Sequence, residues 1–119
     1  EYSQRLKLQR RSVLAGQPNC STGRRIFEAA ASRGARCIAQ PQGAIKEGLR
    51  ADIVVLDPDH PSLIGRTGDS VLDSWIFSGG NACVKDVFVG GRHVVKDRQH
   101  VAEQSIARRF AKAIADLRN

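Results

Sequence analysis

Histidine and acidic side chains are the residues of this chain that could hold a metal ion or transfer protons. The three histidines are His60, His93 and His100. No two of them are separated by the one or three residues that place a ligand pair on one face of a strand or helix. Because a hydrolytic metal site needs several ligands at one point, we expect these histidines to be surface or helix-start residues.

Asp52 and Asp57 flank an aliphatic stretch and resemble a pair of catalytic carboxylates. On an extended strand they would lie about 16 Å apart, whereas the carboxyl pair of a glycosidase is separated by about 5–9.5 Å. The sequence has no G-x-S-x-G motif, and its two Gly-Gly pairs lack the pattern of a phosphate-binding loop. We interpret the two acids as strand-end turn residues and assign no catalytic, cofactor-binding or metal-binding residue in this chain.

The cysteines offer a second possible source of metal or redox chemistry. Cys20, Cys37 and Cys83 are odd in number and include no C-x-x-C pair. Zinc sites and disulfide frameworks favour closely paired cysteines. We therefore expect small buried side chains in a reducing compartment.

A net charge of +7 raises the possibility of a nucleic-acid partner. The basic residues near the start of the chain are Arg5, Lys7, Arg10, Arg11, Arg24 and Arg25. They are spread over more than one expected element, and no aromatic platform for base stacking accompanies them. We do not expect nucleic-acid binding, but a free-standing basic module that binds nucleic acid or a protein partner is the alternative hypothesis.

Length and composition indicate one small globular unit. The 119 residues are 41% hydrophobic and 26% charged, and no apolar run approaches the roughly 18 residues that span a bilayer. We expect no membrane association and a cytoplasmic location. The chain begins with Glu1 and contains no methionine, which favours a fragment or processed piece.

Four stretches have helical signals. The predicted helices cover 1–15, 21–34 and 69–77, together with a C-terminal helix from about residue 102. The second has Ser21 or Thr22 as its N-cap and Gly34 as its C′ residue. The C-terminal helix carries an apolar stripe at Ala102, Ile106, Phe110, Ala113, Ile114 and Leu117.

About three short strands are predicted. Gly90-Gly91 separates 84–89 from 92–96 as a β-hairpin, and 51–57 forms a strand. Within it, Ile53 to Leu56 are all aliphatic, which indicates burial on both faces. So few strands cannot close a barrel or form both layers of a sandwich. We expect an α+β arrangement whose sheet lacks partners, and an exposed strand edge that favours self-association.

Two motifs resemble the metal-dependent amidohydrolase family. The string from Gly43 to Asp57 is similar to the G-x-I-x-x-G-x-x-A-D-I-V-V-L-D segment that follows the catalytic barrel in that family. The string from Val84 to Val95 resembles the hairpin that closes its β-sandwich. Further strings at 4–14, 21–23, 73–77 and 93–97 most resemble the formimidoylglutamate deiminases of histidine degradation.

The resemblance implies a zinc-dependent hydrolysis of N-formimino-L-glutamate to N-formyl-L-glutamate and ammonia. It also implies that the zinc ligands lie on barrel strands outside this sequence, so the chain itself carries no cofactor and no catalytic residue. The implied division is barrel-flanking helices at 1–40, a partial β-sandwich at 41–99 and a C-terminal helix at 100–119. The implied partners are the N-terminal barrel and sandwich strands, and a second copy in a homodimer.

Overall fold

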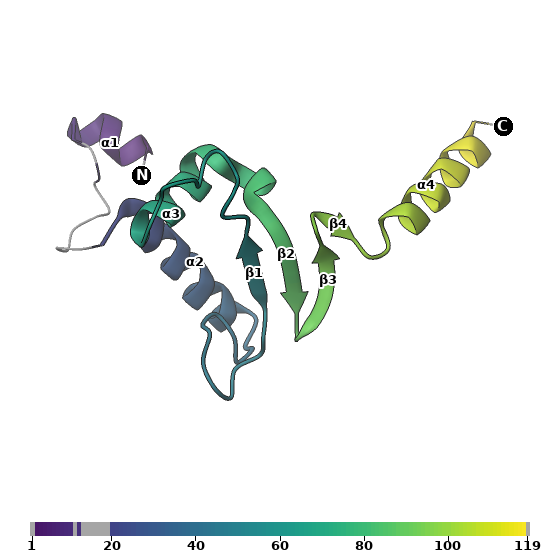
Figure 1. Ribbon diagram of the computed structural model, residues 1–119, viewed down its shortest axis with the longest axis horizontal. Coiled ribbons are helices and arrows are strands. Elements are labelled where there is room, and N and C mark those ends of the chain that lie inside the picture. Colours follow the sequence, from purple (N-terminus) through teal and green to yellow (C-terminus); the bar gives the residue numbers. More distant parts are fainter. Residues whose placement is uncertain (1, 11, 13–19, 119) are drawn as a thin grey trace.

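The computed structural model describes residues 2–10, 12 and 20–118 and shows an α+β fold (Figure 1). Its α-helices are α1 (Tyr2–Leu8), α2 (Thr22–Cys37), α3 (Asp69–Ser74) and α4 (Glu103–Leu117). Its strands are β1 (Ile53–Leu56), β2 (Val84–Val89), β3 (Arg92–Lys96) and β4 (Gln99–His100). The strands form one antiparallel sheet in the order β1-β2-β3-β4.

The first helix is shorter than its sequence predicts. It ends at Leu8, and Gln9 and Ser12 have positive φ angles of 52° and 53°, which no α-helix contains. The predicted helix is therefore wrong at residues 9, 10 and 12, whereas residues 1, 11 and 13–15 lie outside the described part. The ring of Tyr2 packs edge-on against that of Phe77, with 6.3 Å between the ring centres. Leu6 is 72% exposed, so little packing is available to stabilise further turns of this helix.

The second helix is longer than predicted. Ser21, one of the two expected candidates, is its N-cap, and its hydroxyl accepts a hydrogen bond from the Arg24 N–H at 3.1 Å. The helix continues past Gly34 to Cys37, so the prediction of Gly34 as the C′ residue is wrong. Ala35 is buried immediately after Gly34, and this packing outweighs the glycine signal.

The loop between α2 and β1 approaches the helix closely. Gly43 has a φ of 95°, and a β-carbon there would lie 2.6 Å from the Ala31 carbonyl oxygen. The Arg50 N–H donates to the Pro41 carbonyl at 2.6 Å and closes the loop. The chain therefore enters β1 at a position fixed by α2.

Strand β1 lies at the edge of the sheet, and among the described strands it pairs only with β2. Ile53 and Leu56 are half-buried, but Val54 and Val55 are 45% and 37% exposed. The burial on both faces that the aliphatic pattern indicates is therefore absent within this chain, in line with the expectation that its sheet lacks partners. The physical reason is that the described residues place no second layer over the valines.

The β2–β3 hairpin is confirmed, and a fourth strand was not predicted. Gly90 and Gly91 have φ angles of 56° and 78°, as the tightest hairpin turns require. The turn into β4 instead uses Asp97 and Arg98, with φ angles of 46° and 67°. Because arginine is unusual in that conformation and no glycine marks this second turn, it has no recognisable signal in the sequence.

The buried core is small for a chain of this length. Its buried apolar residues are Ala35, Leu63 and Cys83. The accessible surface is 9381 Å², against roughly 6,300 Å² for a compact protein of this mass. The radius of gyration is 18.3 Å, against about 13–14 Å for a compact domain. The chain therefore leaves exposed much apolar surface that a compact protein buries.

No helix of the described residues is both long enough and apolar enough to cross a membrane.

Candidate functional site

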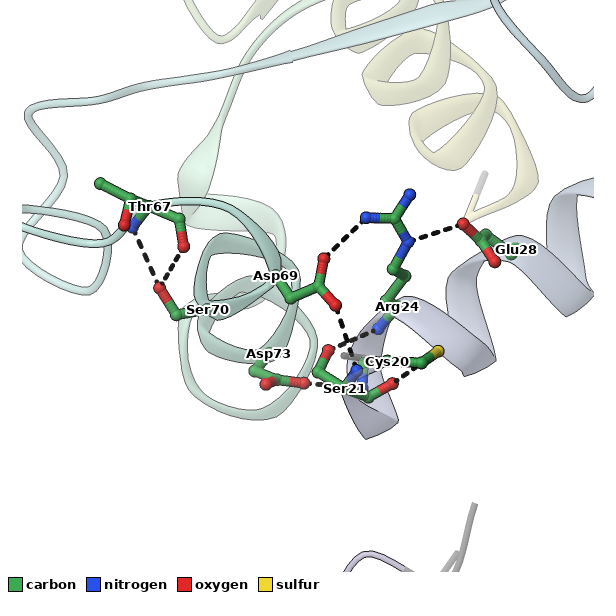
Figure 2. A network of polar contacts seen from close by, with 9 residues as sticks. Cys20, Ser21, Arg24, Glu28, Thr67, Asp69, Ser70 and Asp73 are labelled. Atoms are coloured by element: carbon green, nitrogen blue, oxygen red, sulfur yellow. Dashed lines mark hydrogen bonds and ion pairs between the residues drawn. The ribbon is translucent and has the colours of Figure 1, made fainter. Parts of the chain in front are cut away.

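A network of polar contacts joins the start of α2 to α3 (Figure 2). The Ser21 N–H donates to Asp69 Oδ2 at 3.1 Å, and the Gly23 N–H donates to Asp73 Oδ1 at 2.6 Å. Arg24 Nη1 donates a hydrogen bond to the other carboxylate oxygen of Asp69, Oδ1, at 2.7 Å. We call these five residues, Ser21, Gly23, Arg24, Asp69 and Asp73, the α2–α3 clamp.

Helix-end chemistry explains why the clamp forms. The first N–H groups of a helix have no partner within the helix, and the helix dipole favours negative charge at that end. Asp69 and Asp73 are four residues apart, so both carboxylates lie on one face of α3. That face meets the start of α2, where the two carboxylates and the Ser21 hydroxyl accept hydrogen bonds from three backbone N–H groups.

Gly23 allows the two helices to approach so closely. A β-carbon at this position would lie 2.5 Å from Asp73 Oδ1 and 2.8 Å from both the backbone nitrogen and the α-carbon of Asp73. A backbone contact of that length cannot be relieved by a side-chain rotation. The pairing of Gly23 with Asp73 is therefore a steric requirement as well as a hydrogen bond.

Arg24 connects the clamp to the exposed face of α2. It donates to Asp69 at 2.7 Å and to Glu28 at 2.8 Å. The pKa of Asp69 is lowered, first by the hydrogen bond from Arg24 and then by the hydrogen bond from the Ser21 N–H. The pKa of Arg24 is raised by its hydrogen bonds to Asp69 and Glu28. Because the arginine is 48% exposed, solvent screening keeps its contribution to stability small. These charged groups are paired with one another and act as structural contacts.

The structure separates the three histidines. His60 accepts a hydrogen bond from the Ser62 N–H at 3.2 Å, and its Nδ1 lies 3.3 Å from the buried Cys83 Sγ. His93 contacts Asp86 at 2.8 Å. That hydrogen bond is the largest of the causes that lower the pKa of Asp86.

His100 accepts the Ala102 N–H at 3.1 Å, just ahead of α4. Each histidine therefore has its own local partner. Within residues 2–10, 12 and 20–118, no three His, Cys, Asp or Glu residues are grouped as metal ligands would be.

The two acids that flank β1 also have separate partners. Asp52 accepts from the Gly90 N–H at 2.7 Å and from Arg50 at 2.9 Å, and these bonds, the first foremost, lower its pKa. Asp57 forms an ion pair with Arg98 and accepts the Asp59 N–H at 3.1 Å. Asp52 thus joins the start of β1 to the hairpin turn, and Asp57 joins its end to the turn before β4.

The cysteines differ in exposure. Cys83 is buried, as expected, whereas Cys20 is half-buried and Cys37 is exposed, contrary to the expectation. Cys37 is the last residue of α2, where no other described element covers it.

The clamp was not predicted from the sequence. The available signals were a Ser-x-Gly string at a helix start and two aspartates four residues apart in a later helix. Neither string indicates that the two meet, because 48 and 50 residues separate the bonded partners.

Comparisons with known proteins relate the chain to hydrolytic enzymes. The family model described as "Amidohydrolase family" matches residues 2–94. Formimidoylglutamate deiminase from Pseudomonas aeruginosa is 40% identical over 117 residues, which are 98% of this chain and 26% of that enzyme. The 5-methylthioadenosine/S-adenosylhomocysteine deaminase 1 of Archaeoglobus fulgidus is 33% identical over 79 residues, which are 66% of this chain and 18% of that protein.

A solved structure gives the same relationship in three dimensions. An amidohydrolase from Brucella melitensis matches with a TM-score of 0.79 and 37% identity, over 100% of this chain and 26% of that one. The chain thus spans about a quarter of the length of the Pseudomonas and Brucella proteins.

Proposed function

This chain belongs to the amidohydrolase family, and on that premise we propose that it is the non-catalytic C-terminal part of a formimidoylglutamate deiminase. The complete enzyme would hydrolyse N-formimino-L-glutamate to N-formyl-L-glutamate and ammonia. Its zinc ion would supply the activated water. The described residues offer no grouped ligands that fit such an ion, so no step of the reaction is assigned to them.

The observation that carries this proposal is the distribution of the similarity. Identity of 40% extends over 98% of this chain but over only 26% of the Pseudomonas enzyme. The chain therefore corresponds to one continuous portion of a larger protein, and the remaining three quarters of that protein are available to hold the catalytic groups.

The exposed surfaces support a role in packing against a larger body. Val54 and Val55 on β1 and Phe27 on α2 are large apolar side chains that remain more than a third exposed. Removal of such apolar surface from water stabilises a packed contact by roughly 25 cal/mol per Å². We infer that a barrel and additional sandwich strands cover these residues, and that the α2–α3 clamp holds the helices and sheet in the geometry that this contact requires.

The proposed division of labour places barrel-flanking helices at 1–40, the partial sandwich at 41–99 and the terminal helix at 100–119. Catalysis by the complete enzyme would take place in the cytoplasm, as part of histidine degradation.

Fragment complementation tests this proposal. The chain is mixed with the remaining N-terminal three quarters of the Pseudomonas deiminase, and ammonia release from N-formimino-L-glutamate is measured. We expect no release by either part alone and release by the mixture. Val54→Asp should abolish complementation because it places a charge on the surface that packs, whereas Lys112→Asp on α4 is the control for added negative charge. Ammonia release by this chain alone would contradict the proposal.

The alternative of a basic binding module receives less support from the structure. Three of its arginines, Arg24, Arg50 and Arg98, already form ion pairs with carboxylates, which reduces the positive charge available to phosphates. Affinity for duplex DNA that falls steeply with salt would favour this alternative.

A further inference from the structure

Helix α4 leaves the sheet without packing against it. It buries none of its residues, and it projects from the rest of the molecule (Figure 1). A helix with so few buried contacts keeps one direction only if the chain that leads into it is held in place. We call that chain, residues 97–102 between β3 and α4, the bracket. It contains the turn at Asp97 and Arg98 and the short strand β4.

The first half of the bracket is bonded to β2, which lies on the other side of β3 in the sheet. The Asp97 N–H donates to Asp86 Oδ1 at 3.2 Å, and the Arg98 N–H donates to the Lys85 carbonyl at 2.7 Å. The Arg98 side chain extends further and forms an ion pair with Asp57, just after β1. The turn is therefore tied to β2 and to the end of β1, neither of which pairs with β4.

The second half of the bracket is bonded to β3 and to itself. Strand β4 pairs with the end of β3. The Val101 N–H then donates to the Val94 carbonyl at 3.0 Å, and the Ala102 N–H donates to His100 Nδ1 at 3.1 Å. The Ala102 carbonyl in turn accepts a hydrogen bond from the Ile106 N–H at 2.9 Å. The backbone is thus held in place up to the first turn of α4.

Asp86 joins the bracket to the middle of the sheet. The oxygen that accepts the Asp97 N–H, Oδ1, also accepts a hydrogen bond from His93 Nε2 at 2.8 Å. The His93 ring stacks on the ring of Phe88, with 4.3 Å between the ring centres and 14° between their planes. The bond from His93 is the first of the causes that lower the pKa of Asp86, so the group is ionised at neutral pH. An ionised acceptor forms a stronger hydrogen bond than a neutral one, and the stacked imidazole fixes its position.

The turn needs such contacts because its local sequence does not favour its backbone conformation. Asp97 and Arg98 both have left-handed φ angles, 46° and 67°. Aspartate adopts this conformation more often than most residues, but arginine does so rarely. If the contacts with Asp86, Lys85 and Asp57 were lost, no local preference would keep the turn in its present shape.

We propose that the bracket fixes the direction of α4 relative to the sheet, and that Asp86 is the positioning residue that holds the bracket in place. When the contact with Asp86 is lost, the turn at Asp97 opens, and β4 and α4 move together as one unit. While the contact is made, α4 points in one direction before it meets any surface. Because a pre-ordered segment loses less conformational freedom on contact, the bracket favours docking of α4 on whichever surface receives it.

Hydrogen exchange of single backbone amides in the 119-residue chain tests the role of Asp86. In Asp86→Ala, the N–H groups of Arg98 and Val101 should exchange about tenfold faster, as expected for the loss of one hydrogen bond to a charged group. The Gly91 N–H donates to the Ala51 carbonyl at 2.9 Å. It should keep its exchange rate, because the β2–β3 hairpin remains closed.

Two further substitutions serve as controls for this experiment. Asp86→Asn retains an acceptor oxygen for the Asp97 N–H and should accelerate exchange less than Asp86→Ala does. Asp59→Ala removes an exposed aspartate that forms no ion pair within the described residues. It should leave the exchange rates of the bracket unchanged.

A distance measurement tests the direction of α4 itself. Spin labels are attached to Cys37, which is exposed at the end of α2, and to the side chain introduced by Lys112→Cys on α4. Cys20→Ser removes the half-buried thiol, and the buried Cys83 stays unlabelled. We expect a narrow distribution of distances in this background and a clearly broader one when Asp86→Ala is added. Equal helix content by circular dichroism shows that α4 stays folded in both.

Three results would overturn the proposal. Unchanged exchange at Arg98 and Val101 in Asp86→Ala would show that the bracket does not depend on Asp86. Equal acceleration at Gly91 would show that Asp86 supports the whole sheet and not the bracket in particular. Distance distributions that are equally broad with and without Asp86→Ala would show that α4 has no fixed direction. These measurements do not involve ammonia release, so their outcome is independent of the proposed enzymatic role.

Discussion

Helices α2 and α4 have almost the same length, 16 and 15 residues, and both are amphipathic. Helix α2 buries Gly23 and Ala35, packs Phe27 against Trp75 at 5.7 Å between ring centres, and has its first N–H groups bonded by Ser21 and α3. Helix α4 buries none of its residues.

The difference shows that an amphipathic pattern predicts a packing contact for a helix but does not identify the surface against which the helix packs. The stripe on α4 is the clearer of the two in the sequence, yet α2 is the one that packs within the chain. What distinguishes α2 is a glycine at the contact and two matching carboxylates on α3.

The largest expected effect comes from disturbing the close contact that α2 makes and α4 lacks. Gly23→Ala should lower the free energy of unfolding by about 2–3 kcal/mol, because the new β-carbon overlaps the backbone of Asp73. Gly34→Ala is the matched control in the same helix. A β-carbon there meets nothing within 4 Å, so this change should raise the free energy by about 0.5–1 kcal/mol. Urea unfolding measures both, and equal effects would contradict the role of Gly23.

An identical substitution in each helix sharpens the comparison. Ala30→Gly in α2 should lower the free energy of unfolding by about 1 kcal/mol, since α2 unfolds together with the sheet. Ala111→Gly in α4 should lower the helix content of a dilute sample and leave the unfolding midpoint unchanged, because a helix without packing frays independently. Circular dichroism and hydrogen exchange report the two effects. A lower unfolding midpoint in both variants would show that α4 packs against its own chain.

The smallest effect concerns pH. The pKa of Asp69 is lowered in the folded state, first by the Arg24 hydrogen bond, so the unfolded state binds its proton first as the pH falls. The stability that this bond contributes is present above the ordinary aspartate pKa of about 3.9. It is lost as the pH falls below that value towards the folded pKa.

The thermal midpoints at pH 5 and pH 3 measure this effect. The difference between them should be smaller in Asp69→Asn than in the parent chain. Arg24→Gln should also reduce this difference between the two midpoints. The double variant should reduce it no further than either single variant. Additive effects of the two substitutions would show that the pair does not act as a unit.

Much of the fold was predictable because local chemistry decides it. The Gly90-Gly91 hairpin, the Ser21 cap and the short helix at α3 each depend on residues within a few positions of one another. The features that were placed wrongly from the sequence depend on distant contacts. Ala35 packs and carries α2 past Gly34, whereas little packs against α1 beyond Tyr2.

The clamp and the fourth strand could not be predicted for the same reason. The partners of Ser21 and Gly23 are 48 and 50 residues away. The turn before β4 uses Asp97 and Arg98, a pair without a glycine. Three contacts hold it: the Asp97 N–H donates to Asp86 Oδ1 at 3.2 Å, the Arg98 N–H donates to the Lys85 carbonyl at 2.7 Å, and the Arg98 side chain pairs with Asp57. No local propensity encodes contacts of this kind.

The sequence by itself determined the α+β class, the hairpin, the C-terminal helix and the relationship to amidohydrolases, because motif, turn chemistry and hydrophobic period are local properties of the chain. Only the tertiary structure decided that Gly23 and Asp73 hold α2 against α3, that Val54 and Val55 remain exposed at a sheet edge, and that α4 buries none of its residues. These depend on which surfaces meet in space, and a surface left exposed is visible only once the other contacts of the chain have been placed.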